Sequence, residues 1–139
     1  MAEPTPAYVL DSYALLAYFQ AEVGGPAVLE LVEAARDSKT TLYLSLINAG
    51  EMYYLVHRQK SDKEAEELLD DLRHLPLTLC PVTEDRVWAA ARLKAAHAIS
   101  YADAFAVALA QEFNATLVTG DPEFKSVEAI AKVMWLPGK

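Results

Sequence analysis

The chain has 139 residues and a formal net charge of -8 at pH 7; 53% of its residues are hydrophobic and 23% are charged. This length and composition are typical of one folded domain with its own core, so we expect a single domain over residues 1–139. Proteins that coat nucleic acid are basic, so the negative charge excludes that class. It does not exclude an enzyme that reaches phosphate groups through a bound metal ion.

The sequence also bears on the compartment. No stretch approaches the roughly 20 apolar residues that span a bilayer, and the first residues lack the basic start and apolar run of a signal peptide. Cys80 is the single cysteine, so the chain cannot form an internal disulfide. Its apolar setting indicates a buried thiol rather than a catalytic one. These features predict a cytoplasmic protein.

Short apolar runs alternate with helical segments along the whole chain. Continuous apolar runs are typical of parallel strands that are buried on both faces. The predicted strands are residues 8–10, 42–44, 77–82, 116–119 and 133–136. Pro81 lacks a backbone N–H, so the third strand should end irregularly.

The predicted helices carry their own signals. Residues 12–20 are apolar almost all round, which indicates a buried helix. After the break at residues 24–26, the apolar residues Val28, Leu31, Val32 and Ala35 recur at helical spacing. Further helices are expected after the capping box at residues 61–64, from Thr83 to about His97, over residues 101–114, and from Asp121, which precedes a proline. Strands that alternate with helices predict an α/β fold with a parallel sheet and helices on both faces.

Four acids stand near the predicted helix starts: Asp11, Glu51, Asp103 and Asp121. Asp11 and Asp121 directly follow predicted strands, and Asp103 begins the helix that returns to the fourth strand. In a parallel sheet, the carboxyl ends of the strands and the amino ends of the following helices share one edge. We therefore expect the four carboxylates to meet at that edge.

Helix capping is an alternative explanation for each acid. Residues 48–51 and 100–103 have capping-box spacing, and Asp121-Pro122 is a typical helix start. A capping carboxylate can still bind a ligand, and four carboxylates gathered together repel one another unless a cation intervenes. Oxygen ligands alone favour Mg²⁺ or Mn²⁺. Zinc is disfavoured because His57, His74 and His97 fall on three different predicted helices without a cysteine partner.

The blocks around these acids resemble a known family. They are Val9-Leu-Asp11-Ser-Tyr-Ala-Leu-Leu, Ser45-Leu-Ile-Asn-Ala-Gly-Glu51, Ser100-Tyr-Ala-Asp103-Ala-Phe and Leu117-Val-Thr-Gly-Asp121-Pro-Glu-Phe124, followed by Trp135-Leu-Pro137. In this order and spacing, they resemble the motif blocks of the PIN domain and are most similar to those of the VapC-type toxins of type II toxin–antitoxin systems. The resemblance covers essentially the whole chain.

This resemblance implies a three-layer α/β/α PIN-like fold with a five-stranded parallel sheet. It also implies a Mg²⁺- or Mn²⁺-dependent endoribonuclease, often a homodimer, that a cognate antitoxin protein neutralises. Asp11 and Asp103 would be the main direct metal ligands, and Glu51 and Asp121 would complete the site, partly through water. Thr119 matches a hydroxyl position that helps to orient the water or the metal, and Glu123 could share the role of Asp121. We expect RNA phosphodiester bonds to be cleaved by metal-activated water.

Other assignments stay open at this point. Arg58, Lys60 and Arg86 are candidates for contacts with RNA, although each is also explained as a solvated helix charge. The chain could instead be a noncatalytic PIN-fold interaction module or a metal-dependent nuclease that acts on DNA. A haloacid-type phosphatase is disfavoured because Tyr13 stands where its second Asp is needed. A receiver domain is disfavoured because the end of the third strand runs Cys80-Pro81-Val82-Thr83 and supplies no Asp.

Overall fold

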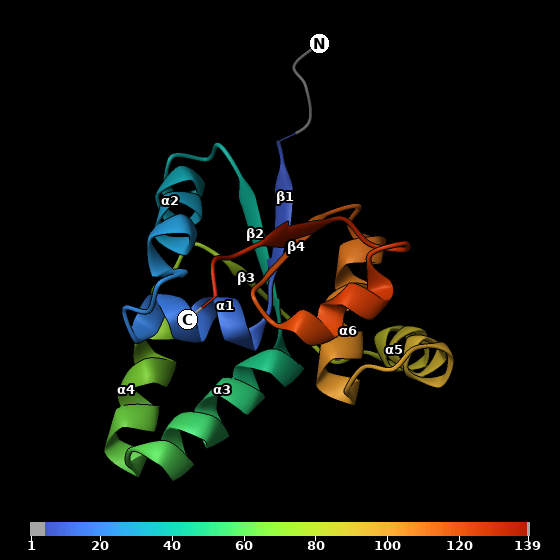
Figure 1. The fold of residues 1–139 in the computed structure, drawn as a ribbon. Coiled ribbons are helices and arrows are strands. Elements are labelled where there is room, and N and C mark those ends of the chain that lie inside the picture. Colours follow the sequence, from blue (N-terminus) through green and yellow to red (C-terminus); the bar gives the residue numbers. More distant parts are fainter. Residues whose placement is uncertain (1–4, 139) are drawn as a thin grey trace.

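The computed structural model describes residues 5–138, in which five parallel strands form one sheet in the order β3-β2-β1-β4-β5 (Figure 1). The strands are β1 (Ala7–Leu10), β2 (Thr41–Ser45), β3 (Thr78–Cys80), β4 (Thr116–Thr119) and β5 (Val133–Trp135). The five predicted strands are confirmed. Only β3 is markedly shorter than predicted, because Pro81 has no N–H with which to continue the pairing. Residues 1–4, for which the sequence predicts no signal peptide, and residue 139 lie outside the described range.

Helices cover both faces of this sheet. They are α1 (Ser12–Phe19), α2 (Gly25–Arg36), α3 (Leu46–Gln59), α4 (Asp62–Arg73), α5 (Glu84–Ala96) and α6 (Tyr101–Glu112), and a 3₁₀ helix, η1 (Pro122–Val127), follows β4. Figure 1 shows α2, α3 and α4 on one side of the sheet and α5 and α6 on the other. Within residues 5–138, no helix combines the length and the apolar character needed to cross a bilayer.

Alternating strand residues supply two separate cores. Leu10 of β1 and Val118 of β4 pack with buried residues of α1 to α4, whereas Val9 and Leu117 pack with those of α6 and η1. This alternation follows from the pleat of a strand, in which successive side chains point to opposite faces. The predicted three-layer α/β/α fold is therefore confirmed.

The register of the central strands aligns their carboxyl ends. Leu10 pairs with Leu44 of β2 on one side and with Val118 of β4 on the other. The residues that follow, Asp11 and Thr119 among them, therefore come level at one edge of the sheet. From β1, the sheet extends in one direction through β2 and β3 and in the other direction through β4 and β5. This reversal of strand order is the place where α/β proteins bind ligands.

Candidate functional site

Asp11 is the most firmly held carboxylate at this edge. It follows β1, forms the N-cap of α1 and is 2% exposed. Its Oδ1 accepts a hydrogen bond from Ala14 N at 2.8 Å, and its Oδ2 accepts one from Thr119 Oγ1 at 2.5 Å. Burial raises the pKa of Asp11 to about 7, although the hydrogen bonds from Thr119 and Ala14 act in the opposite direction.

Thr119 links Asp11 to the loop that carries Asp121. It is fully buried at the end of β4, and its Oγ1 also accepts a hydrogen bond from Asp121 N at 3.0 Å. On the other side of this loop, the ring of Tyr13 packs against Gly120. A Cβ added at Gly120 would lie 2.7 Å from Tyr13 Cζ, so glycine permits this close approach. The two contacts fix the path of the chain between β4 and η1.

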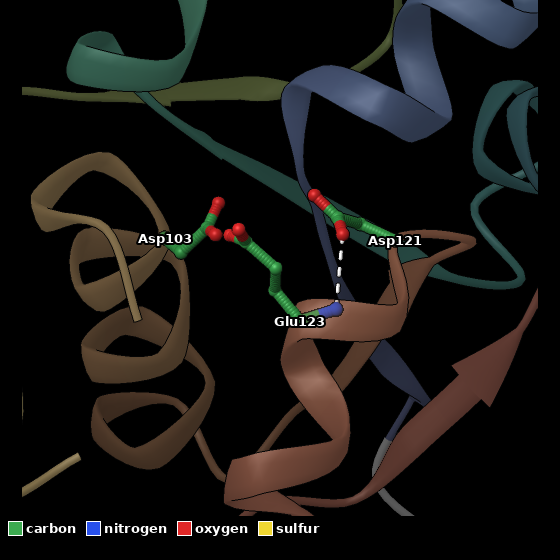
Figure 2. Close-up of side chains that lie close together, drawn as sticks. All are labelled: Asp103, Asp121 and Glu123. Carbon is green, nitrogen blue, oxygen red and sulfur yellow. Dashed lines mark hydrogen bonds between the residues drawn. The ribbon is translucent and has the colours of Figure 1, made fainter. Parts of the chain in front are cut away.

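Asp103, Asp121 and Glu123 form a cluster of carboxylates (Figure 2). One carboxylate oxygen of each lies within 4.8 Å of those of the other two. Asp103 projects from the first turn of α6, whereas the other two stand at the start of η1, where Asp121 Oδ1 accepts a hydrogen bond from Glu123 N at 3.0 Å. The structure thus places Glu123 beside Asp121 in the same cluster.

The electrostatics of Asp103 connect this cluster to the other acids. Asp103 is 7% exposed, and its burial raises its pKa to about 7. The carboxylates of Asp121, Glu123 and Glu51 raise it further, against a lowering by Ser100. The charges of Asp103 and Asp121 likewise raise the pKa of Asp11. The charges of Asp103 and Asp121 thus reach Asp11, and the charge of Glu51 reaches Asp103.

Glu51 occupies the second turn of α3, beside the start of α1. It is half-buried, and its Oε1 accepts a hydrogen bond from Ser12 Oγ at 2.5 Å. Because Ser12 directly follows Asp11, this contact ties the carboxylate of Glu51 to the start of α1, but Glu51 does not belong to the cluster of Asp103, Asp121 and Glu123. Ser12 was not among the residues singled out in the sequence; its position directly after Asp11 was the available signal.

Capping accounts for only part of this arrangement. Asp11 and Asp121 do cap α1 and η1, and Ser100 caps α6 by accepting a hydrogen bond from Asp103 N at 3.1 Å. The capping box suggested for residues 48–51 does not form, because Ser45 caps α3 and Asn48 lies inside this helix. At residues 100–103, the bond from Asp103 N to Ser100 is the first half of a capping box, so capping accounts for an acid at the start of α6. Capping does not account for Glu51, which lies in the second turn of α3.

Arg86, a candidate for RNA contact, is engaged elsewhere. Its guanidinium donates two hydrogen bonds to the carboxylate of Glu112, at 3.0 and 2.9 Å, and one to Pro81 O at 3.0 Å. It also lies over the ring of Phe113. These contacts join α5 to the end of α6. They occupy three N–H donors of the guanidinium, so few donors remain to bind a phosphate. Arg58 similarly lies over the ring of Tyr54.

The donor set fits a hard divalent cation. The clustered donors of Asp103, Asp121 and Glu123 are all carboxylate oxygens, and their spacing of up to 4.8 Å suits a cation whose oxygen ligands lie about 2.0–2.6 Å away. A cation would also favour the charged forms of the two buried carboxyls whose pKa values are raised. Within residues 5–138, no group containing His or Cys meets the same spacing.

Comparisons with known proteins support the same fold. The crystal structure of VapBC2 from Rickettsia felis bound to a promoter DNA fragment contains a chain 21% identical, with 94% of this chain and 99% of that chain covered and a TM-score of 0.72. VapC20 from Mycobacterium tuberculosis, described as a sarcin–ricin loop cleaving toxin, is 18% identical, with 94% of this chain and 99% of that chain covered and a TM-score of 0.73. FitAcB from Neisseria gonorrhoeae is 19% identical, with 91% and 96% of the two chains covered and a TM-score of 0.67.

At these low sequence identities, the solved structures are evidence for the fold alone. No curated protein sequence matches significantly. The sequence model of the PIN domain, in contrast, matches residues 8–130, which include all of the acids described above. The match spans most of the chain and agrees with the parallel sheet and its acidic edge. The chain therefore belongs to the PIN domain family.

Proposed function

We propose that this chain is a Mg²⁺- or Mn²⁺-dependent endoribonuclease that acts as the toxin of a type II toxin–antitoxin pair. The observation that carries the proposal is the meeting of Asp103, Asp121 and Glu123 within 4.8 Å, next to the buried Asp11, at the switch point of a PIN-family sheet. Buried carboxylates whose pKa values are strongly raised are typical of functional sites. A bound cation would offset the repulsion among these carboxylates and favour their charged forms.

Each residue has a distinct part in the proposed site. Asp11 and Asp103 would bind the cation directly, and Glu51 and Asp121 would complete its surroundings, partly through water; Glu123 would share the role of Asp121. A divalent cation held by these carboxylates would polarise the scissile phosphate and lower the pKa of an attacking water. Thr119 keeps Asp11 oriented through its hydrogen bond to Oδ2.

The substrate and partners follow from the resemblance to VapC-type toxins. VapC20 is described as cleaving the sarcin–ricin loop, which favours RNA as the substrate. Several similar structures are toxin–antitoxin complexes, which favours a cognate antitoxin protein as a partner. A homodimer and a cytoplasmic location belong to the same proposal. The acidic net charge of -8 suggests that RNA is bound by local contacts and the cation rather than by a broad basic surface.

Cleavage of a structured RNA tests this function. We expect cleavage with Mg²⁺ or Mn²⁺, none with excess EDTA, and a loss on the order of 100-fold or more in Asp103→Asn, which removes the negative charge of a direct ligand of the proposed cation. Asp70→Asn is the matched control, because it makes the same change at an exposed position of α4 and should leave cleavage unchanged.

Three outcomes separate the alternatives. Undiminished cleavage in EDTA or in Asp103→Asn contradicts the metal site. Faster cleavage of DNA of the same sequence indicates a DNA-directed nuclease with the same site. A folded protein that cleaves neither substrate, and whose melting temperature Mn²⁺ does not raise, is instead a noncatalytic interaction module.

A further inference from the structure

Asn48 connects the two helices that carry Glu51 and Asp103. It is the third residue of α3 and is completely buried. Its Nδ2 donates a hydrogen bond to Ala102 O at 3.2 Å. Asn48 precedes Glu51 by three residues, so both side chains lie on the same side of α3. Ala102 directly precedes Asp103 in the first turn of α6. One side-chain amide thus links the backbone next to Asp103 to the helix face that bears Glu51.

The other half of this amide is unusual. Asn48 Oδ1 is buried and accepts no hydrogen bond from any residue in the range 5–138. Exchanging the amide oxygen and nitrogen would set two acceptors against each other at Ala102 O, so this contact fixes the orientation of the amide. An unpaired buried acceptor is destabilising, whereas an apolar side chain of the same shape would avoid it. The stability of the fold alone therefore does not explain asparagine here.

We propose that Asn48 is a positioning residue of the acidic site: its amide holds the first turn of α6 against α3 and so sets the separation of the Glu51 and Asp103 carboxylates. The inference rests on the metal site of the proposed function. A small divalent cation demands nearly fixed distances to its oxygen ligands, so a small shift of α6 weakens its binding.

Metal affinity without RNA tests this role. Isothermal titration with Mn²⁺ compares the wild type with Asn48→Leu, which keeps the approximate size but removes the donor, and with Asn48→Ala, a second variant in case the first does not fold. We expect Mn²⁺ to bind about 10- to 100-fold more weakly to both variants, as is typical when a residue that supports metal ligands is lost. Thermal unfolding in EDTA measures stability separately.

Val56→Ala is the matched control. Val56 lies on the same helix, is 3% exposed and packs in the core with α4. Its truncation should lower the melting temperature at least as much as Asn48→Leu does, yet leave the Mn²⁺ affinity within twofold. A purely structural Asn48 would behave like this control.

The outcomes distinguish the two proposals. A loss of fivefold or more in Mn²⁺ affinity in an Asn48 variant, with Val56→Ala unaffected, supports the positioning role. A smaller loss, or an equal loss in Val56→Ala, overturns it and leaves the metal site standing. A wild type that does not bind Mn²⁺ overturns the metal site itself, and the inference falls with it.

Discussion

Thr119 is fully buried, and its hydroxyl serves both Asp11 and the backbone of Asp121. Thr119→Val keeps the shape of the side chain but removes a hydrogen bond that lowers the pKa of Asp11, so this pKa should rise above about 7. We expect Mn²⁺ affinity at pH 7 to fall about 10-fold, as when a support of a metal ligand is lost. The pH at which binding is half-maximal should move upward, and titrations with Mn²⁺ between pH 6 and pH 8.5 measure both effects.

Thr116→Val provides the control for this substitution. Thr116 begins the same strand, at the end away from Asp11, and Thr116→Val makes the same chemical change, the replacement of a hydroxyl by a methyl group. Its pH profile for Mn²⁺ binding should match that of the wild type. An unshifted profile in Thr119→Val would show that the hydroxyl does not govern the protonation of Asp11.

Sequence patterns identify the acids better than the residues that support them. Asp11 and Asp121 are recognisable because each follows an apolar strand, and strand ends gather at one edge. The contacts of Ser12 with Glu51 and of Asn48 with Ala102 span 39 and 54 residues. They depend on how α3 packs against α1 and α6, which no local spacing encodes. Supporting polar contacts of this kind therefore became visible only in the structure.

Among the secondary-structure elements, the start of α3 illustrates how pairing overrides a local signal. Both Ser45 and Asn48 are good N-cap residues, and the spacing from Asn48 to Glu51 favoured the later one. The strand β2 pairs with β3 as far as Ser45 and Cys80, and α3 begins directly afterwards. Asn48 consequently falls inside the helix and is buried. The sequence predicted that a helix starts here, but the sheet determines at which residue.

The attachment of α5 to α6 gives a prediction about stability. Arg86 holds Glu112 with two parallel hydrogen bonds, a geometry that lysine cannot reproduce. Arg86→Lys should lower the free energy of unfolding by about 1–2 kcal/mol. RNA cleavage by the folded protein should not change, because these contacts already occupy the guanidinium. Urea unfolding and the cleavage assay measure the two effects.

Lys63 and Glu67 form the comparison pair within α4. They lie 3.9 Å apart, with side chains that are 83% and 61% exposed. Lys63→Ala should change the free energy of unfolding by less than about 0.5 kcal/mol, as is usual for an exposed pair. If Arg86→Lys instead unfolded at the wild-type urea concentration and slowed cleavage by weakening RNA binding, Arg86 would be a substrate contact after all.

For the whole molecule, the sequence predicted the layers, the parallel sheet and the gathering of acids at one edge. The reason is that each of these depends on alternation along the chain and on rules for parallel connections. The order of the strands and the depth of each acid needed the structure. Asp11 and Asp103 are buried, whereas Glu123 stands exposed at the rim. The protein thus places part of its negative charge where water screens it poorly, and its stability must depend on pH.

This burial predicts the sign of that dependence. Below about pH 3.8, Asp11 and Asp103 are protonated in both the folded and the unfolded chain. Between pH 3.8 and about 7, the unfolded chain releases these protons while the folded protein keeps them, so stability falls as the pH rises. Each unit of pKa difference is worth about 1.4 kcal/mol. In EDTA, these two carboxyls should therefore favour a higher melting temperature at pH 5 than at pH 7.5.

The difference between the wild type and Asp103→Asn measures this effect, because the two proteins share every other titrating group. Removing the charge of Asp103 also removes one cause that raises the pKa of Asp11, which adds to the effect in the same direction. Asn is neutral at every pH, so the variant should gain stability over the metal-free wild type at pH 7.5, and this advantage should be much smaller at pH 5 and vanish below about pH 3.8. Mn²⁺ at about 100 times its dissociation constant should stabilise the wild type at pH 7.5 by about 2.7 kcal/mol and leave the variant almost unchanged. If the metal-free variant were no more stable than the wild type at pH 7.5, the buried carboxylate would impose no electrostatic strain for a cation to relieve.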